Sequence, residues 1–346
     1  MTRVVRIRGL RRAAAATAAL IVLALVLRAL LGSGVQIGRA ADLLTHPAVP
    51  WIFLALACEL ASYLAYALAQ RRLLRATGHR LNARWLACLS VAAQSLSNFL
   101  PAGYLASNVL NFRELRNRSL ASAHATWVLL MTSVLYIGTL ATLALVGAEL
   151  AGGEAAGAVR DLGIGALTLL ALLALSLPAL TRRIRRSLTP GLSGRTRRFL
   201  AAVSEVKLSR RDLAICGALF TACWIADAAC LVATFPAVGA AVPWTTLLVA
   251  YCGAQLASFI PITPGGVGLV EGSLAVVLVT HGVSGIHVLS AILLYRMISY
   301  WGTLPAGAAG YAVVRRTRPG WPQEERVASS GWPASTSVIS AVPSNT

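Results

Sequence analysis

A single carboxylate and three glycines in the stretch 259–271 are the residues of this sequence best placed to do chemistry. The stretch reads Phe-Ile-Pro-Ile-Thr-Pro-Gly-Gly-Val-Gly-Leu-Val-Glu and lies inside an apolar run that extends over about 244–280. A carboxylate is expensive in such surroundings, so Glu271 is a candidate functional group. Glycine permits unusual backbone geometry, and free amides at the start of a helix attract anions. We therefore predict a binding site made by Glu271, Thr263, Gly265, Gly266 and Gly268.

Two short helices must position this site. The apolar segments 247–260 and 267–280 are each about 21 Å long as helices, at about 1.5 Å per residue, and a bilayer core is about 30 Å thick. Pro261 and Pro264 between them lack the N–H that a continuous helix needs. Irregular backbone at membrane depth survives where it is buried in protein or lines a cavity, and transporters bind substrate at such breaks.

Composition indicates a polytopic all-α membrane protein with no sizeable soluble domain. The chain has 346 residues, of which 57% are hydrophobic and 12% charged, and several apolar runs exceed 18 residues. The net charge of +19 does not indicate nucleic acid, because the basic residues cluster between apolar runs, as cytoplasmic loops require. The six cysteines all fall in apolar segments and have no metal-ligand spacing, so we interpret them as packing residues, with neither a metal nor disulfides implied.

The basic loops determine a topology of about six full spans and two broken or re-entrant hairpins, which makes eight membrane segments. The predicted spans are 13–31, 51–70, 121–146, 164–180, 213–235 and 288–314, and the hairpins are 85–112 and 244–281. If 85–112 crossed the membrane once, the loop 181–211 with its ten basic residues would be outside. A hairpin there places 27 of the 31 Lys and Arg residues inside, with both termini in the cytoplasm of a bacterial cell.

The order span, span, hairpin, span then occurs twice with opposite orientation, which is typical of an inverted repeat. We expect a basic N-terminus at 1–12, a membrane domain at 13–314 and a disordered tail at 315–346, with the repeats at about 13–148 and 162–314. Ser97-Asn-Phe-Leu-Pro101 and Ala257-Ser-Phe-Ile-Pro261 fall at matching places, so Pro101 and Gly103 are the expected break of the first hairpin. Part of the basic loop, 195–208, is predicted as an amphipathic helix on the anionic inner leaflet.

The string Pro261-x-x-Pro264-Gly-Gly-x-Gly268-x-x-Glu271-Gly resembles the signature of the lysylphosphatidylglycerol synthase transmembrane (flippase) family. Arg296, followed by Tyr300 and Pro305, is similar to the arginine on that family's last helix, and Asn98-Phe-Leu-Pro101-Ala-Gly103 to its first-half motif, without the acidic residue and second glycine expected there. The resemblance covers about 10–315. It implies translocation of a polar-headed lipid, and adds Arg296, Asn98 and Tyr300 to the substrate site. The synthase's soluble aminoacyl-transferase domain is absent, so the chain is not expected to make its own lipid.

The charged residues in the spans each have a structural alternative. Glu271 can cap the amides at the helix break, and Arg296 can be its ion-pair partner as well as a phosphate ligand. Glu59 and Asp227 lie near the middle of corresponding spans, where a neutral buried carboxyl holding a neighbouring helix is the alternative to a functional pair.

Three functions remain in competition. The first is a phospholipid flippase working by alternating access, with no enzymatic activity, cofactor or metal, and with an anionic or aminoacylated lipid as partner. The second is a membrane-embedded lipid-modifying enzyme; it lacks clustered aspartates, and Ser273 has no intramembrane histidine. The third is a non-transporting assembly or scaffold protein, whose hairpins would enclose no hydrated cavity. The sequence leaves the oligomeric state open, a homo-oligomer included.

Overall fold

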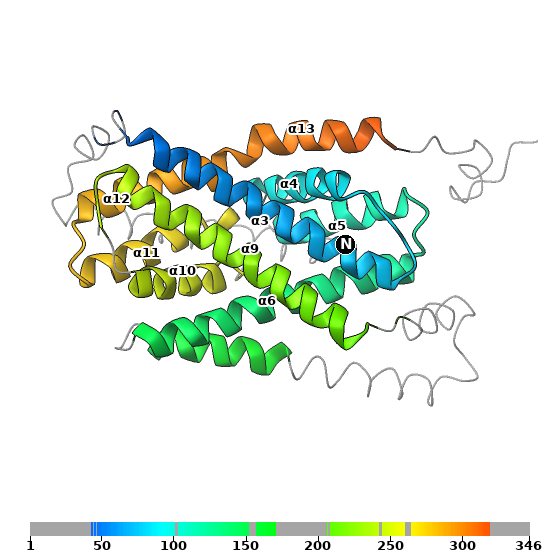
Figure 1. Ribbon diagram of the computed structural model, residues 1–346, viewed down its shortest axis with the longest axis horizontal. Helices are drawn as coiled ribbons and strands as arrows, with labels where there is room; N and C mark the ends of the chain where they lie inside the picture. Colours follow the sequence, from blue (N-terminus) through cyan, green and yellow to red (C-terminus); the bar gives the residue numbers. More distant parts are fainter. Residues whose placement is uncertain are drawn as a thin grey trace, which may run out of the picture.

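The computed structural model describes residues 47–100, 103–151, 157–170, 208–241, 244–259 and 264–318, with positions 43, 45 and 206. Every regular element in these ranges is helical, and no strand occurs in them (Figure 1). The helices are α3 (Val49–Ala76), α4 (Ala83–Phe99), α5 (Gly103–Arg116), α6 (Ser122–Ala151), α9 (Arg210–Ala237), α10 (Trp244–Ser258), α11 (Leu269–Thr280), α12 (Gly285–Arg296) and α13 (Thr303–Arg316), with a 3₁₀ turn at Pro264–Gly266, a π-helical turn at Met297–Trp301 and a further helix over 157–170. The predictions for 1–12, 13–31 and the tail beyond 318 lie outside the described residues, as do 171–180 of the predicted span 164–180 and all but 206 and 208 of the predicted helix 195–208.

Three of these helices, α3, α6 and α9, are long and apolar enough to cross a membrane. They have 28, 30 and 28 residues, which is more than 40 Å of helix at about 1.5 Å per residue. The predicted spans 51–70 and 213–235 fall inside α3 and α9, and 121–146 begins one residue before α6 and otherwise falls inside it. The chain is therefore an integral membrane protein built from helices.

Helices α3 and α9 form an antiparallel pair at the centre of the molecule (Figure 1). Contacts along its whole length link Ala48 N–H to the Ala237 carbonyl (2.9 Å), Ser62 Oγ to Cys223 Sγ (3.2 Å), and Arg72 Nε to Asp212 Oδ1 (2.6 Å). In each pair the two residue numbers add to 284 or 285, as one uninterrupted antiparallel register requires. Cys216, Cys223 and Cys230 are all buried on α9, as their seven-residue spacing predicts, and none of the six cysteines forms a disulfide.

Two pairs of short helices correspond to the predicted hairpins. Helix α4 ends at Phe99 and α5 begins at Gly103; α10 ends at Ser258 and α11 begins at Leu269. Each pair packs against the last span of the other half: α4 contacts α13, and α10 contacts α6. The contact of α4 with α13 is close, since a Cβ on Gly310 would lie 2.6 Å from the Cys88 carbonyl oxygen. Small residues at helix interfaces allow such an approach in membranes.

The last predicted span, 288–314, is not one regular helix. It consists of α12, the π-helical turn Met297–Trp301 and α13. A π turn accommodates one extra residue in a helix and is frequent at functional sites. Here it starts directly after Arg296, at the residue that the sequence singled out.

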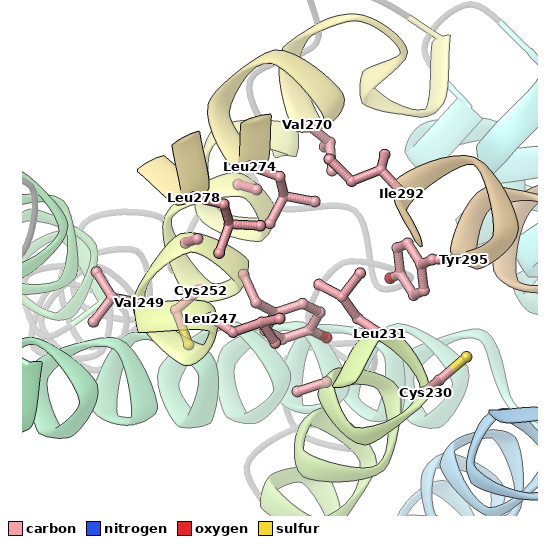
Figure 2. Close-up of a cluster of buried hydrophobic side chains, with 14 of the residues drawn as sticks. Cys230, Leu231, Leu247, Val249, Cys252, Val270, Leu274, Leu278, Ile292 and Tyr295 are labelled. Carbon is pink, nitrogen blue, oxygen red and sulfur yellow. The ribbon is translucent and has the colours of Figure 1, made fainter. Parts of the chain in front are cut away.

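The apolar core of the second half lies between α9, α10, α11 and α12 (Figure 2). Val270, Leu274 and Leu278 recur every four residues along one face of α11 and are buried at 3% exposure or less. Figure 2 shows them between Leu247 and Cys252 of α10 and Ile292 of α12. This face fixes α11, and with it the helix start that carries Glu271.

We predict that Gly310→Leu will destabilise the protein by about 1–3 kcal/mol or more, because the side chain has no room against the α4 backbone. The melting temperature of the purified protein in detergent should fall by several degrees. Gly217→Leu on α9 is the matched control, since a Cβ there meets nothing within 4 Å. Equal melting temperatures for the two variants would contradict the close contact of α4 and α13.

Candidate functional site

A cavity of about 420 Å³ lies between the helices of the two halves. Residues from α3, α4, α5, α6, α9, α10, α11 and α12 line it, together with the break at Gly265 and the π-helical turn. Most of the residues that line it have polar side chains, which is unusual inside an apolar helix bundle. The charged members are Glu59, Asp227 and Arg296, and the uncharged polar members include Ser62, Tyr63, Gln94, Ser97, Asn98, Asn108, Asn111, Thr132, Ser133, Gln255, Ser258, Tyr295 and Ser299.

Glu271 makes both of the contacts that its position suggested. Its Oε1 lies 2.6 Å from Arg296 Nε, and its Oε2 accepts a 2.7 Å hydrogen bond from the Gly268 N–H at the start of α11. One carboxylate thus caps the half-helix and pairs with the arginine on α12. The two side chains are 23% and 13% exposed, so water screens this pair only weakly.

Arg296 keeps binding capacity beyond this ion pair. It lines the cavity, and its Nη2 is buried without a hydrogen-bond partner. The guanidinium carbon lies 5.5 Å from the centre of the Tyr300 ring, which fixes the side chain from one side. A buried guanidinium donor without an acceptor is costly, and guanidinium groups bind phosphate in a fork geometry. Arg296 is therefore the described residue best suited to hold an anion in the cavity.

The break between α10 and α11 packs against the C-terminal end of α4, the first helix of the first hairpin. Gly265 has φ of +58°, and a Cβ there would lie 2.7 Å from the Asn98 carbonyl oxygen and 2.5 Å from the Tyr300 ring. The Tyr300 hydroxyl donates to the same Asn98 carbonyl (3.0 Å), and Asn98 Nδ2 donates to Thr303 Oγ1 (3.2 Å). The end of α4, the break and the π-helical turn therefore meet at one point where only glycine fits.

The remaining predicted residues of the two breaks are placed as follows. Gly266 and Gly268 have φ of +68° and +84°, and the Gly268 N–H is the donor to Glu271. Pro264 opens the 3₁₀ turn and Gly103 opens α5, where it lines the cavity. Pro101, Pro261 and Thr263 lie outside the described residues.

Glu59 and Asp227 face one another across the central pair of helices. Their residue numbers add to 286, so they fall at the same level of the α3–α9 register, and the two carboxyl groups interact directly. Asp227 accepts hydrogen bonds from the Tyr251 hydroxyl (2.5 Å), Gln255 Nε2 (3.1 Å) and the Tyr295 hydroxyl (3.1 Å). Glu59 is 8% exposed, and its Oε2 is buried without a partner. The sequence placed these two residues at corresponding points of two spans, but it gave no signal that they meet.

Sequence reasoning missed the three donors to Asp227. Tyr251 and Gln255 are one helical turn apart in an otherwise apolar half-helix, which is a signal for a shared polar face. Tyr295 directly precedes Arg296 but gives no periodic signal. Among the described residues, no group of three His, Cys, Asp or Glu side chains lies close enough to hold a metal ion.

Comparison with known families gives one match that covers most of the chain. The family described as "Lysylphosphatidylglycerol synthase TM region" matches residues 15–307. The match includes both hairpins, Glu59, Asp227, Glu271 and Arg296. No curated protein matches the sequence.

We predict that the two contacts of Glu271 can be separated by substitution. Glu271→Gln retains an oxygen for the Gly268 N–H but leaves Arg296 without its carboxylate. Because the two side chains are partly exposed, the cost should be about 1–3 kcal/mol, below the figure for a fully buried pair. Glu271→Ala should cost about 1 kcal/mol more, because the cap is also lost. Denaturation of the purified variants in mixed detergent measures both costs.

The double variant Glu271→Gln/Arg296→Gln is the control for this experiment. It removes both charges and should recover part of the lost stability. If Glu271→Gln were as stable as the wild type, the ion pair would contribute nothing to the fold. If Glu271→Ala matched Glu271→Gln, the cap would contribute nothing.

Proposed function

The chain belongs to the lysylphosphatidylglycerol synthase transmembrane family, and from this premise we propose that it is a flippase that moves a polar-headed phospholipid between the leaflets of a membrane. The family's description names a phospholipid, which links the chain to membrane lipid. The observation that carries the proposal is the polar cavity of about 420 Å³ inside an apolar helical bundle. Cavities of roughly 300–1,000 Å³ take small-molecule ligands, so a lipid headgroup fits this size class.

In this proposal the headgroup passes through the cavity while the acyl chains stay in the bilayer. The outer surface supports this arrangement, because large apolar side chains such as Phe53, Leu60 and Val276 are more than half exposed. A headgroup moving through the bilayer core without protein would lose its hydration at high cost. The cavity supplies hydroxyl and amide groups in place of water.

Arg296 is proposed as the phosphate ligand, through the buried Nη2 that has no partner among the described residues. Glu271 holds Arg296 when no lipid is bound, and contacts a cationic group when the headgroup is aminoacylated. Asn98, Tyr300, Thr263 and the glycines of the break complete the proposed site; Gly265 allows the close approach to Asn98, and the Gly268 amide holds Glu271. The chain would carry out no covalent step on the lipid.

We further propose that the two halves form an inverted repeat and exchange access to the cavity by moving against one another. The antiparallel direction of α3 and α9 supports this, because they occupy equivalent places in the two halves. The packing of each hairpin against the other half supports it too. Helix α4 contacts α13 of the second half, and α10 contacts α6 of the first half. In this arrangement the α4–α5 and α10–α11 pairs are re-entrant hairpins, bringing the number of membrane segments to eight.

The proposed location is the bacterial cell membrane, with both termini in the cytoplasm. Arginine-bearing helix ends gather at one end of the molecule, where Arg72 pairs with Asp212, Arg318 with Glu114, and Arg118 donates to the Thr317 carbonyl at 2.9 Å. The positive-inside rule places this end in the cytoplasm.

Reconstitution in liposomes with fluorescent phospholipids tests the proposal. Wild-type protein should accelerate exchange between leaflets, and Glu271→Gln or Arg296→Ala should slow it roughly tenfold or more, since each removes a charge-assisted contact. Glu149→Gln and Arg160→Ala, at exposed positions, are matched controls and should leave the rate unchanged.

Each contrary outcome has its own meaning. If neither site variant changed the exchange rate, the proposed flippase activity would stand and this site would be excluded. No exchange with zwitterionic, anionic and aminoacylated lipids would overturn the proposed phospholipid flippase and favour an assembly role.

A further inference from the structure

We propose that Glu59 and Asp227 form a proton-binding site on the cavity wall, with the exchangeable proton on Glu59. We also propose that loading this proton favours an anionic headgroup at Arg296. The second statement rests on the proposed function, whereas the first concerns the site itself.

The two carboxyl groups differ in their partners. Three donors, the Tyr251 and Tyr295 hydroxyls and the Gln255 amide, satisfy Asp227. Glu59 has hydrogen-bond partners in Tyr63 and Cys230, but its Oε2 is buried and has no partner among the described residues. Hydrogen bonds to a carboxylate favour its charged form, and a buried carboxylate oxygen without a donor disfavours it. Two adjacent buried carboxylates cannot both ionise at low cost. Asp227 is thus the charged member, and Glu59 is the member that carries a proton.

The surroundings supply no dedicated cation for Glu59. Arg296 is the described cation that acts on Asp227, and it is already bound to Glu271. The other titratable groups that face the pair are thiols and phenols: Cys58, Tyr63 and Tyr66 on α3, Cys223 and Cys230 on α9, Tyr136 on α6, Tyr251 on α10 and Tyr295 on α12. None of these is positively charged when protonated. Ionised Glu59 would therefore add an uncompensated negative charge to the cavity.

The geometry favours a proton over a metal cation. A metal cation needs several free oxygen ligands, whereas the oxygens of Asp227 are occupied by three donors. Glu59 Oε2 is one free oxygen at the edge of a polar cavity. One oxygen is sufficient to bind a proton.

The charge count of the cavity connects the proton to the substrate. With Glu59 neutral, the charged residues that line the cavity are Arg296 and Asp227, while Glu271 is the ion-pair partner of Arg296 and does not line the cavity. Ionisation of Glu59 adds a second negative group to the lining and repels the phosphate of a headgroup. Proton and anionic headgroup should therefore bind together, and linkage requires that each raises the affinity for the other.

Infrared spectroscopy of the full chain in zwitterionic nanodiscs tests the proton site without any transport assay. The wild type should show a protonated-carboxyl C=O band that disappears as the pH is raised, and Glu149→Gln should keep it. Glu59→Gln should lose the band. A band unchanged in Glu59→Gln would overturn the proposal.

Asp227→Asn is the second variant, in case Glu59→Gln does not fold. It retains Glu59 but removes the neighbouring negative charge, so the pH at which the band disappears should move. An unmoved band would show that the two carboxyl groups do not share a site and would overturn the pairing.

Leaflet exchange of an anionic lipid, measured against pH, tests the coupling. The wild-type rate should change by up to about tenfold per pH unit, as for one bound proton, and the Glu59→Gln rate should be flat. The same pH dependence in both proteins would overturn the coupling. A sodium-dependent rate without a carboxyl band would overturn the proton in favour of a metal cation. A Glu59 band without exchange of any lipid would support the proton site and contradict the proposed function.

Discussion

The antiparallel contact between α3 and α9 is the constraint on which the rest of the structure depends. It is uninterrupted from Ala48 and Ala237 at one end to Arg72 and Asp212 at the other. A register without slippage means that each residue on α3 has a fixed neighbour on α9. Glu59 and Asp227 therefore meet because of their distances along the two helices, and the cavity lies beside them. In hydrocarbon surroundings, every polar group that this contact buries must find its partner within the protein.

The second half of the site depends on a different physical requirement, which is close approach of backbones. Gly265 contacts the Asn98 carbonyl, and Tyr300 donates to that same carbonyl. The π-helical turn brings Tyr300 to this point directly after Arg296. The ion pair, the break and the turn are consequently parts of one local arrangement, and the position of Arg296 depends on all three.

The sequence predicted features of the site where it contained residues that are energetically costly inside a membrane. Charges in apolar runs led to Glu271, Arg296, Glu59 and Asp227, and prolines with glycines led to the interrupted element between α10 and α11. Other features had no local signal. The π-helical turn falls in an apolar run that reads as a regular span, and the α3–α9 register depends on contacts between residues about 140–190 apart in the chain. The glycines pointed to free amides at the break, whereas Gly265 lies against Asn98 and the Gly268 amide is bound by Glu271. Such pairings depend on tertiary packing, which a single sequence does not reveal.

The packing of α4 against α13 also has a consequence for the synthesis of the protein. Helix α4 lies against α13, but α4 ends at Phe99 and α13 begins at Thr303, so roughly two hundred residues are synthesised between the two partners. During that interval the Ser95 and Asn98 side chains of α4 lack the helix that later contacts them through Gly307 and Thr303, and lipid is a poor partner for them. The nascent first half therefore stays incomplete until the last helix is synthesised. Until then the insertion machinery or its own helices must shield these polar side chains from lipid. Synthesis of α13 is thus the step that closes the fold, and a chain that stops before Thr303 leaves a polar surface open to the membrane.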